Sequence, residues 1–116
     1  MAKMVVIKLS PNDLNTEIKK EDNSFLSVRE VETGALESLF LVAANAQKDV
    51  RKINTCYDLA DEVKNLNAAE VFKISPSDLK DYLIPAFEKT VDQRPASWRY
   101  AKNMFKSIEK AEEIEV

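Results

Sequence analysis

The feature that most restricts the fold of this chain is a stretch from residue 35 to residue 74 that contains neither glycine nor proline. Apolar side chains recur along it at alternating steps of three and four residues: Leu36, Leu39, Ala43, Ala46, Val50, Ile53, Tyr57 and Ala60. This spacing places the side chains in one stripe along a helix and predicts a helix over about residues 33–66. The helix would be roughly 50 Å long at about 1.5 Å per residue.

A helix of that length is more than a domain of 116 residues buries by itself, which leaves two arrangements open. In the first, the helix breaks near residues 45–49 and forms a helical hairpin. In the second, it projects and packs on a second copy of the chain through the later part of the stripe, Val50, Ile53, Tyr57 and Ala60. The segment Leu39–Ala44 is apolar on all sides, so we expect that end of the helix to lie in the core.

Gly34 is the only glycine in the sequence. Phosphate-binding loops need several glycines, and sheets rich in tight hairpins use glycine in their turns, so both are disfavoured. Hydrophobic residues make up 45% of the chain and charged residues 32%, a balance typical of a folded globular protein. We therefore expect one domain over residues 1–116, of the α+β class and mainly α-helical.

Residues 6–14 and 71–79 share one pattern, a short β-prone run with an internal lysine followed by Ser-Pro-x-Asp-Leu. Serine is a good helix N-cap, proline suits the first helical turn, and aspartate favours the positive end of the helix dipole. The pattern predicts a strand followed by a capped helix in both places. We expect the strands, about Met4–Leu9 and Val71–Ile74, to pair in a small two-stranded sheet. The repeat could mark a duplicated binding unit, or simply two similar corners at which a strand leads into a helix. We favour two similar corners.

The other elements follow from the remaining breaks in the sequence. The first capped helix should be short, because a polar Glu-Asp-Asn-Ser loop follows it, and Phe25–Val31 fits either a helical turn or a strand. We expect two C-terminal helices, one over Pro76–Lys89 that is kinked by Pro85, and one that begins at Pro95 after a loop. The glutamate-rich chain end should fray.

The residues that most catalytic and metal sites need are scarce. The chain has no histidine, and a nucleophile at Cys56, the only cysteine, would lack the usual base. Carboxylates gather at Asp58, Asp61 and Glu62, with Glu70 beyond, and we interpret them as a solvated helix face. We therefore expect no enzymatic activity, no metal and no cofactor. The absence of a signal-peptide core and of a membrane-spanning stretch predicts a cytoplasmic protein without membrane contact.

The strongest candidate for a binding surface is a basic and aromatic strip near the C-terminus. Arg99, Lys102, Lys106 and Lys110 follow one another at steps of three and four residues along a predicted helix face. The residues that we single out for partner binding are Arg94, Trp98, Arg99, Lys102 and Lys106. Such a strip can be a solvated face, can grip a protein partner through the indole, or can neutralise phosphates while its rings stack on bases. A net charge of −3 is too mild to indicate a nucleic-acid binder. Among binding roles we therefore favour protein contact.

In layout, residues 36–113 resemble small helical proteins encoded by tailed bacteriophages and prophages. The resemblance rests on a helix end, a strand, a Ser-Pro corner, a proline loop and a final helix end: Tyr57–Val63, Glu70–Ile74, Ser75–Leu79, Arg94-Pro95 and Ile108–Glu113. It implies a protein-interaction module, which would act either as an accessory component in particle assembly or as an inhibitor bound to a larger host or viral machine. It carries over no functional residues.

Overall fold

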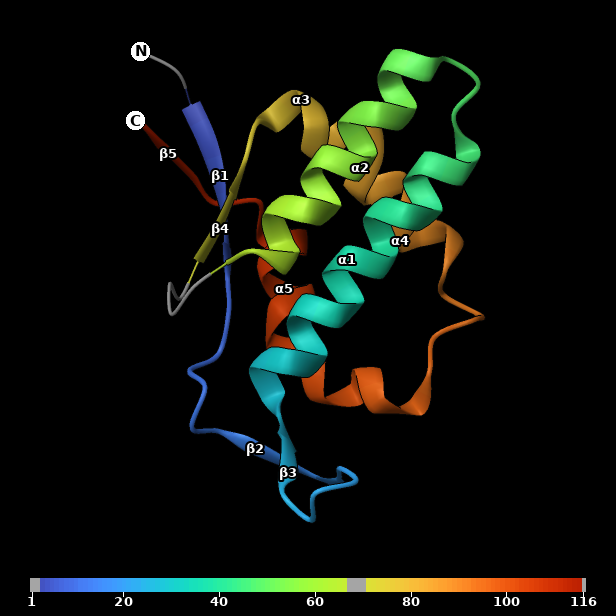
Figure 1. Cartoon of the computed structure of the whole chain (residues 1–116). Helices are drawn as coiled ribbons and strands as arrows, with labels where there is room; N and C mark the ends of the chain where they lie inside the picture. The colour runs from blue at the N-terminus through green and yellow to red at the C-terminus, as the bar shows by residue number, and fades with distance from the viewer. Residues whose placement is uncertain (1–2, 67–70, 116) are drawn as a thin grey trace.

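The structure is a computed structural model that describes residues 3–66 and 71–115. Its helices are α1 (Val28–Ala46), α2 (Val50–Lys64), α3 (Pro76–Asp78), α4 (Ile84–Lys89) and α5 (Lys102–Lys110), with a π-helical turn η1 (Leu79–Leu83) and a 3-10 helix η2 (Ala96–Ala101). Its strands are β1 (Lys3–Lys8), β2 (Asn15–Lys19), β3 (Phe25–Ser27), β4 (Val71–Ile74) and β5 (Glu113–Glu115). The chain has an α+β fold in which helices predominate, as predicted (Figure 1).

The long helical stretch forms a hairpin, so a continuous helix over residues 33–66 is wrong and the first of the two arrangements is confirmed. α1 begins earlier than predicted, because Ser27 Oγ accepts a hydrogen bond from the Glu30 N–H at 3.0 Å in a capping box. α2 has a cap of its own, since the Asp49 carboxylate accepts from the Arg51 N–H at 2.8 Å. The two helices lie side by side (Figure 1).

The hairpin divides the apolar stripe between the core and the surface. Four of its members are buried, namely Leu36, Leu39, Ala43 and Ala60. Ile53 is partly buried, whereas Val50 is 69% exposed and Tyr57 is 45% exposed. Of the residues proposed for self-association, Ala60 is therefore part of the core of this chain, and Val50 and Tyr57 are open to solvent.

The predicted pairing of the first strand with the Val71–Ile74 strand is confirmed. β1 and β4 run antiparallel, with Val5 opposite Ile74 and Ile7 opposite Phe72. A two-stranded sheet with a frayed chain end is wrong, because β5 pairs with the other edge of β1, giving the order β4-β1-β5. A separate antiparallel pair is formed by β2 and β3. The ambiguous segment is thus a strand up to Ser27 and a helix from Val28 on.

The two Ser-Pro corners have different structures, so the capped helix predicted after the first strand is wrong. At the second corner, Ser75 Oγ accepts from the Asp78 N–H at 3.1 Å and α3 begins. At the first corner, Ser10 instead donates from its N–H and its Oγ to the Glu32 carboxylate, at 2.6 and 3.0 Å. The chain then makes a turn closed by Leu14 and enters β2. Ser10 therefore hydrogen-bonds to the distant Glu32 side chain and does not cap a helix.

Pro85 interrupts its helix, and the interruption takes the form of the π-helical turn η1. The turn is closed by a hydrogen bond from the Ile84 N–H to the Leu79 carbonyl. Proline has no N–H for the carbonyl four residues before it, and its ring would collide with that carbonyl in a regular helix. The wider π turn relieves both problems, and Leu79, Tyr82 and Leu83 within it are buried.

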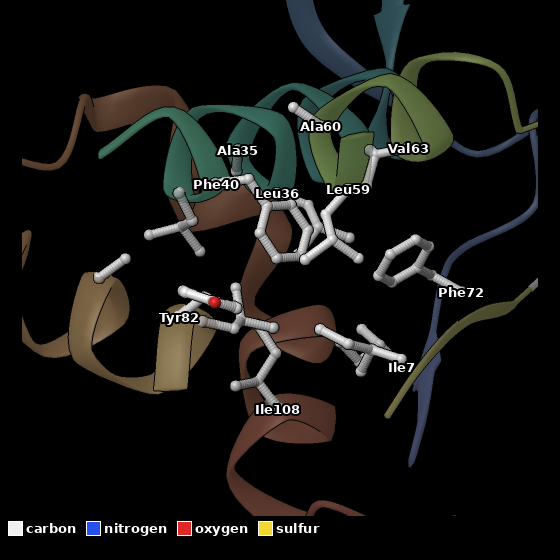
Figure 2. Packing of buried hydrophobic residues seen from close by; sticks show 14 of the residues in the cluster. Ile7, Ala35, Leu36, Phe40, Leu59, Ala60, Val63, Phe72, Tyr82 and Ile108 are labelled. Atoms are coloured by element: carbon white, nitrogen blue, oxygen red, sulfur yellow. The ribbon is translucent and has the colours of Figure 1, made fainter. Parts of the chain in front are cut away.

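The core lies where the α1–α2 hairpin, the three-stranded sheet and the C-terminal helices meet (Figure 2). Phe40 of α1 and Phe72 of β4 face each other there, with ring centroids 5.9 Å apart. Ser107 ties α5 to β1, because its Oγ accepts from the Lys8 N–H at 2.9 Å and donates to the Val6 carbonyl at 3.4 Å. These contacts fix the orientation of α5 and therefore determine which of its side chains are exposed.

Candidate binding groove

An open groove of about 570 Å³ is formed by the end of α4, the loop that follows it, η2 and α5. All five residues predicted for partner binding line it, namely Arg94, Trp98, Arg99, Lys102 and Lys106. The remaining lining residues are Phe87, Pro95, Ala96, Phe105 and Glu109. The structure thus brings the predicted residues together on one concave surface, which we call the C-terminal groove.

The walls of the C-terminal groove are a cluster of three aromatic rings. Phe105 of α5 meets Phe87 of α4 edge to face, with centroids 5.3 Å apart, and it meets the Trp98 ring at 5.8 Å. All three side chains are partly buried and pack against the core. The short 3-10 helix is what places the indole here, because it follows Pro95 directly and leads into the first turn of α5. The result is an apolar surface with rigid, well-supported rings.

Arg94 is a structural part of the groove wall. Its Nη2 donates to the Phe87 carbonyl at 2.9 Å, at the end of α4, where backbone carbonyls lack helical partners. Its guanidinium carbon lies 4.2 Å from the Phe87 ring centroid and 5.0 Å from that of Phe105. The buried Nε finds no hydrogen-bond acceptor among the described residues, as fits a guanidinium bounded by ring faces. Arg94 therefore holds the aromatic cluster to the loop.

The other cations form an exposed rim. Arg99 donates from Nη2 to the Tyr100 hydroxyl at 3.0 Å and lies over that ring, and this hydrogen bond raises the pKa of the guanidinium. Lys102 and Lys106 are exposed on successive turns of α5, and neither forms an ion pair within residues 3–66 and 71–115. Four cations thus line the groove against one acid, Glu109, in a chain whose net charge is −3.

Lys110, predicted to continue the same helix face, faces a second hollow. This polar hollow of about 350 Å³ is lined by Lys106 and Lys110 together with Ser10, Glu32 and others. The predicted single file of cations is therefore divided. Arg99, Lys102 and Lys106 line the C-terminal groove, whereas Lys110 lines the polar hollow, which Lys106 also lines. A 3-10 turn at the start of the segment rotates Arg99 away from the regular α-helical spacing.

Glu32 is the residue with an evident physical role that the sequence analysis missed. It is fully buried in α1, where Ser10 donates two hydrogen bonds to its carboxylate. Burial raises the pKa of this carboxyl, although the Ser10 donors and the charge of Arg29 oppose the rise. A signal was present in the sequence, because Glu32 lies four residues from both Val28 and Leu36 and hence on the buried face of the helix.

The other candidates from the sequence show no reactive arrangement. Cys56 is fully buried, and burial raises the pKa of its thiol, which keeps it protonated and inert. Asp58, Asp61 and Glu62 are exposed on α2, and Glu70 lies outside the described residues. The described part of the chain holds no group of three or more potential metal ligands. None of its helices has the length and apolarity required to traverse a bilayer.

Comparisons of the chain with protein-family models, with curated proteins and with solved structures gave no match. What the groove can bind is therefore argued from its own residues.

Proposed function

We propose that this protein is a non-enzymatic protein-interaction module and that the C-terminal groove is its binding surface. The observation that carries the proposal is the combination, on one concavity, of three supported aromatic rings with exposed cations that form no ion pair among the described residues. Aromatic residues and arginine are the side chains most enriched at the centres of protein interfaces. A volume of about 570 Å³ is also within the range of about 300–1,000 Å³ typical of specific binding pockets.

Nucleic-acid binding is the second candidate, and the cationic rim is the observation that favours it. Single-stranded nucleic acid is usually held by rings whose faces are free to stack on successive bases. Here the rings of Phe87, Trp98 and Phe105 pack on one another, and Tyr100 is engaged by Arg99. Ring faces that are occupied within the protein suit the docking of an apolar side chain better than base stacking.

The resemblance to proteins of tailed phages and prophages suggests two settings for such a module. It would be an accessory component during particle assembly, or an inhibitor seated on a larger host or viral machine. Both settings need a rigid surface patch and no chemistry. We propose the cytoplasm or the virion as its location, a choice supported by a lone thiol that is buried and unpaired.

The proposal is tested by capturing the partner with the tagged chain and identifying it by mass spectrometry. Trp98→Ala combined with Arg99→Glu should abolish capture, because it removes the apolar anchor and reverses a rim charge. Lys48→Glu with Lys52→Glu is the matched control, since both lysines are exposed, Lys48 in the loop before α2 and Lys52 in its first turn. Circular dichroism should show both variants folded. If the identified partner is still captured by the Trp98 variant, the groove is not the binding surface.

A further inference from the structure

We infer that the C-terminal groove receives an acidic peptide segment of a partner protein, which docks one large apolar side chain on the aromatic wall and sets carboxylates against the α5 rim. This inference rests on the proposed function and adds the chemical class of the partner segment. The apolar part of the proposed peptide segment is inferred from the aromatic walls of the groove. Phe87, Trp98 and Phe105 are each only partly buried, so apolar ring surface remains in contact with water until a ligand covers it.

The charge of the partner segment follows from the rim. Arg99, Lys102 and Lys106 are exposed, and no carboxylate of the described residues forms an ion pair with them. Lysines elsewhere in the chain do find such partners, for example Lys20 with Glu30 at 3.1 Å. The cations are thus concentrated at the groove while the protein as a whole is acidic. Charge complementarity selects a segment that carries acids on both sides of its apolar side chain.

The spacing of the rim also fits such a segment. Lys102 and Lys106 are four residues apart on α5, so their Cβ atoms are about 6 Å apart. Side chains on one face of an extended peptide repeat at about 6.6 Å, because each residue advances the chain by about 3.3 Å. Acids at alternate positions of an extended segment would therefore meet the two lysines together. Glu109, the one acid in the lining, should repel the segment at its end of the groove.

The sole tryptophan of the chain lies in the groove, so its emission reports occupancy directly. The probe is a short acetylated peptide of glutamates flanking one phenylalanine, which is not excited with tryptophan. We expect a saturable change in Trp98 emission that weakens as salt rises. The same peptide with serine for phenylalanine, or with glutamine for glutamate, should bind about tenfold more weakly or worse. An oligodeoxythymidine of similar charge should change the emission far less.

Substitutions in the protein separate the parts of the inference. Lys102→Glu with Lys106→Glu should weaken peptide binding about tenfold, whereas Lys48→Glu with Lys52→Glu should leave it unchanged. Glu109→Gln should strengthen binding severalfold, because it removes the negative charge that lines the groove. All of these residues are exposed, so the substitutions should leave the fold intact, which urea unfolding of each variant checks.

The outcomes that overturn the inference differ from those that overturn the proposed function. No saturable change up to about 1 mM peptide, or equal binding of the glutamine peptide, rejects an acidic segment even if Trp98-dependent partner capture succeeds. Stronger binding of the oligodeoxythymidine assigns the groove to nucleic acid. A concentration-dependent emission change without any peptide, matched by a dimer mass, would assign the groove to a second copy of the chain. Each of these four results rejects the acidic-peptide assignment.

Discussion

The buried carboxylate of Glu32 joins the N-terminal segment to α1, and its replacement should expose how much of the fold depends on it. The carboxylate accepts from the Ser10 N–H at 2.6 Å and from the Ser10 Oγ at 3.0 Å, while Arg29, itself buried, donates to the Ser10 carbonyl at 3.3 Å. Glu32→Ala removes both acceptors for the hydrogen bonds from Ser10. Glu32→Gln keeps the shape and one carbonyl acceptor.

The two substitutions should differ clearly in the free energy of unfolding. Ser10 donates two hydrogen bonds to this carboxylate, and a hydrogen bond to a charged group contributes about 1.5–3 kcal/mol. Part of this is offset because the alanine variant no longer buries a carboxylate, so we expect Glu32→Ala to destabilise by about 3 kcal/mol. Glu32→Gln should cost less than about 1 kcal/mol, since its amide oxygen still accepts from the Ser10 N–H.

Urea unfolding at neutral pH, followed by circular dichroism and Trp98 emission, measures the difference. The control is Glu88→Ala, which removes an exposed carboxylate from α4 and should lie within about 0.5 kcal/mol of the wild type. A Glu32→Ala variant as stable as that control would show that the carboxylate does not hold the N-terminal segment. A glutamine variant as unstable as the alanine one would show that charge, and not the acceptor geometry at Ser10, is what matters.

Three further outcomes are expected. Because burial raises the pKa of the Glu32 carboxyl, the folded state holds that proton more tightly than the unfolded state. The stability that the proton contributes is therefore full below the ordinary pKa of 4.5 and is lost as pH rises through the raised pKa. Glu32→Gln should flatten this decline of the urea midpoint with pH, and an unchanged slope would contradict the assignment to Glu32. Ser75→Ala should destabilise by about 1 kcal/mol through loss of the α3 cap, and no loss would mean that the cap is not needed. Light scattering should show a monomer whose mass is unchanged by Val50→Ser with Tyr57→Ser; a dimer lost on that change would make their exposed edge an interface.

Most of the fold could be predicted where local chemistry and tertiary packing agree. The helical hairpin is a partial example, because it was one of two arrangements left open and the apolar stripe predicts the buried face of α1, while Val50 and Tyr57 of the stripe are exposed. The pairing of β1 with β4 is another, since each strand alone would leave its backbone unpaired. In these elements the residues next to one another in the sequence already favour the structure that the whole chain adopts.

The failures occur where a distant residue decides the outcome. The two Ser-Pro corners have nearly the same local sequence, yet Ser75 caps a helix and Ser10 bonds to a carboxylate 22 residues away. The glutamate-rich chain end has one apolar residue in three at β5, which is too little to predict a strand, but pairing with the open edge of β1 makes it one. Neither partner is visible in a window of a few residues.

The C-terminal groove combines both cases. Helical spacing predicted one face for Arg99, Lys102, Lys106 and Lys110, and the first three line the groove together with Trp98, whereas Lys110 lines the polar hollow. The contacts of Arg94 with the Phe87 carbonyl and ring could not be predicted from helical spacing. They depend on how the loop after α4 brings the guanidinium back to that helix. With Arg94 engaged inside the wall, the charge available to a partner is that of the exposed rim alone. If the groove binds acidic segments as we propose, their carboxylates meet exposed side chains, and rising salt should weaken the binding accordingly.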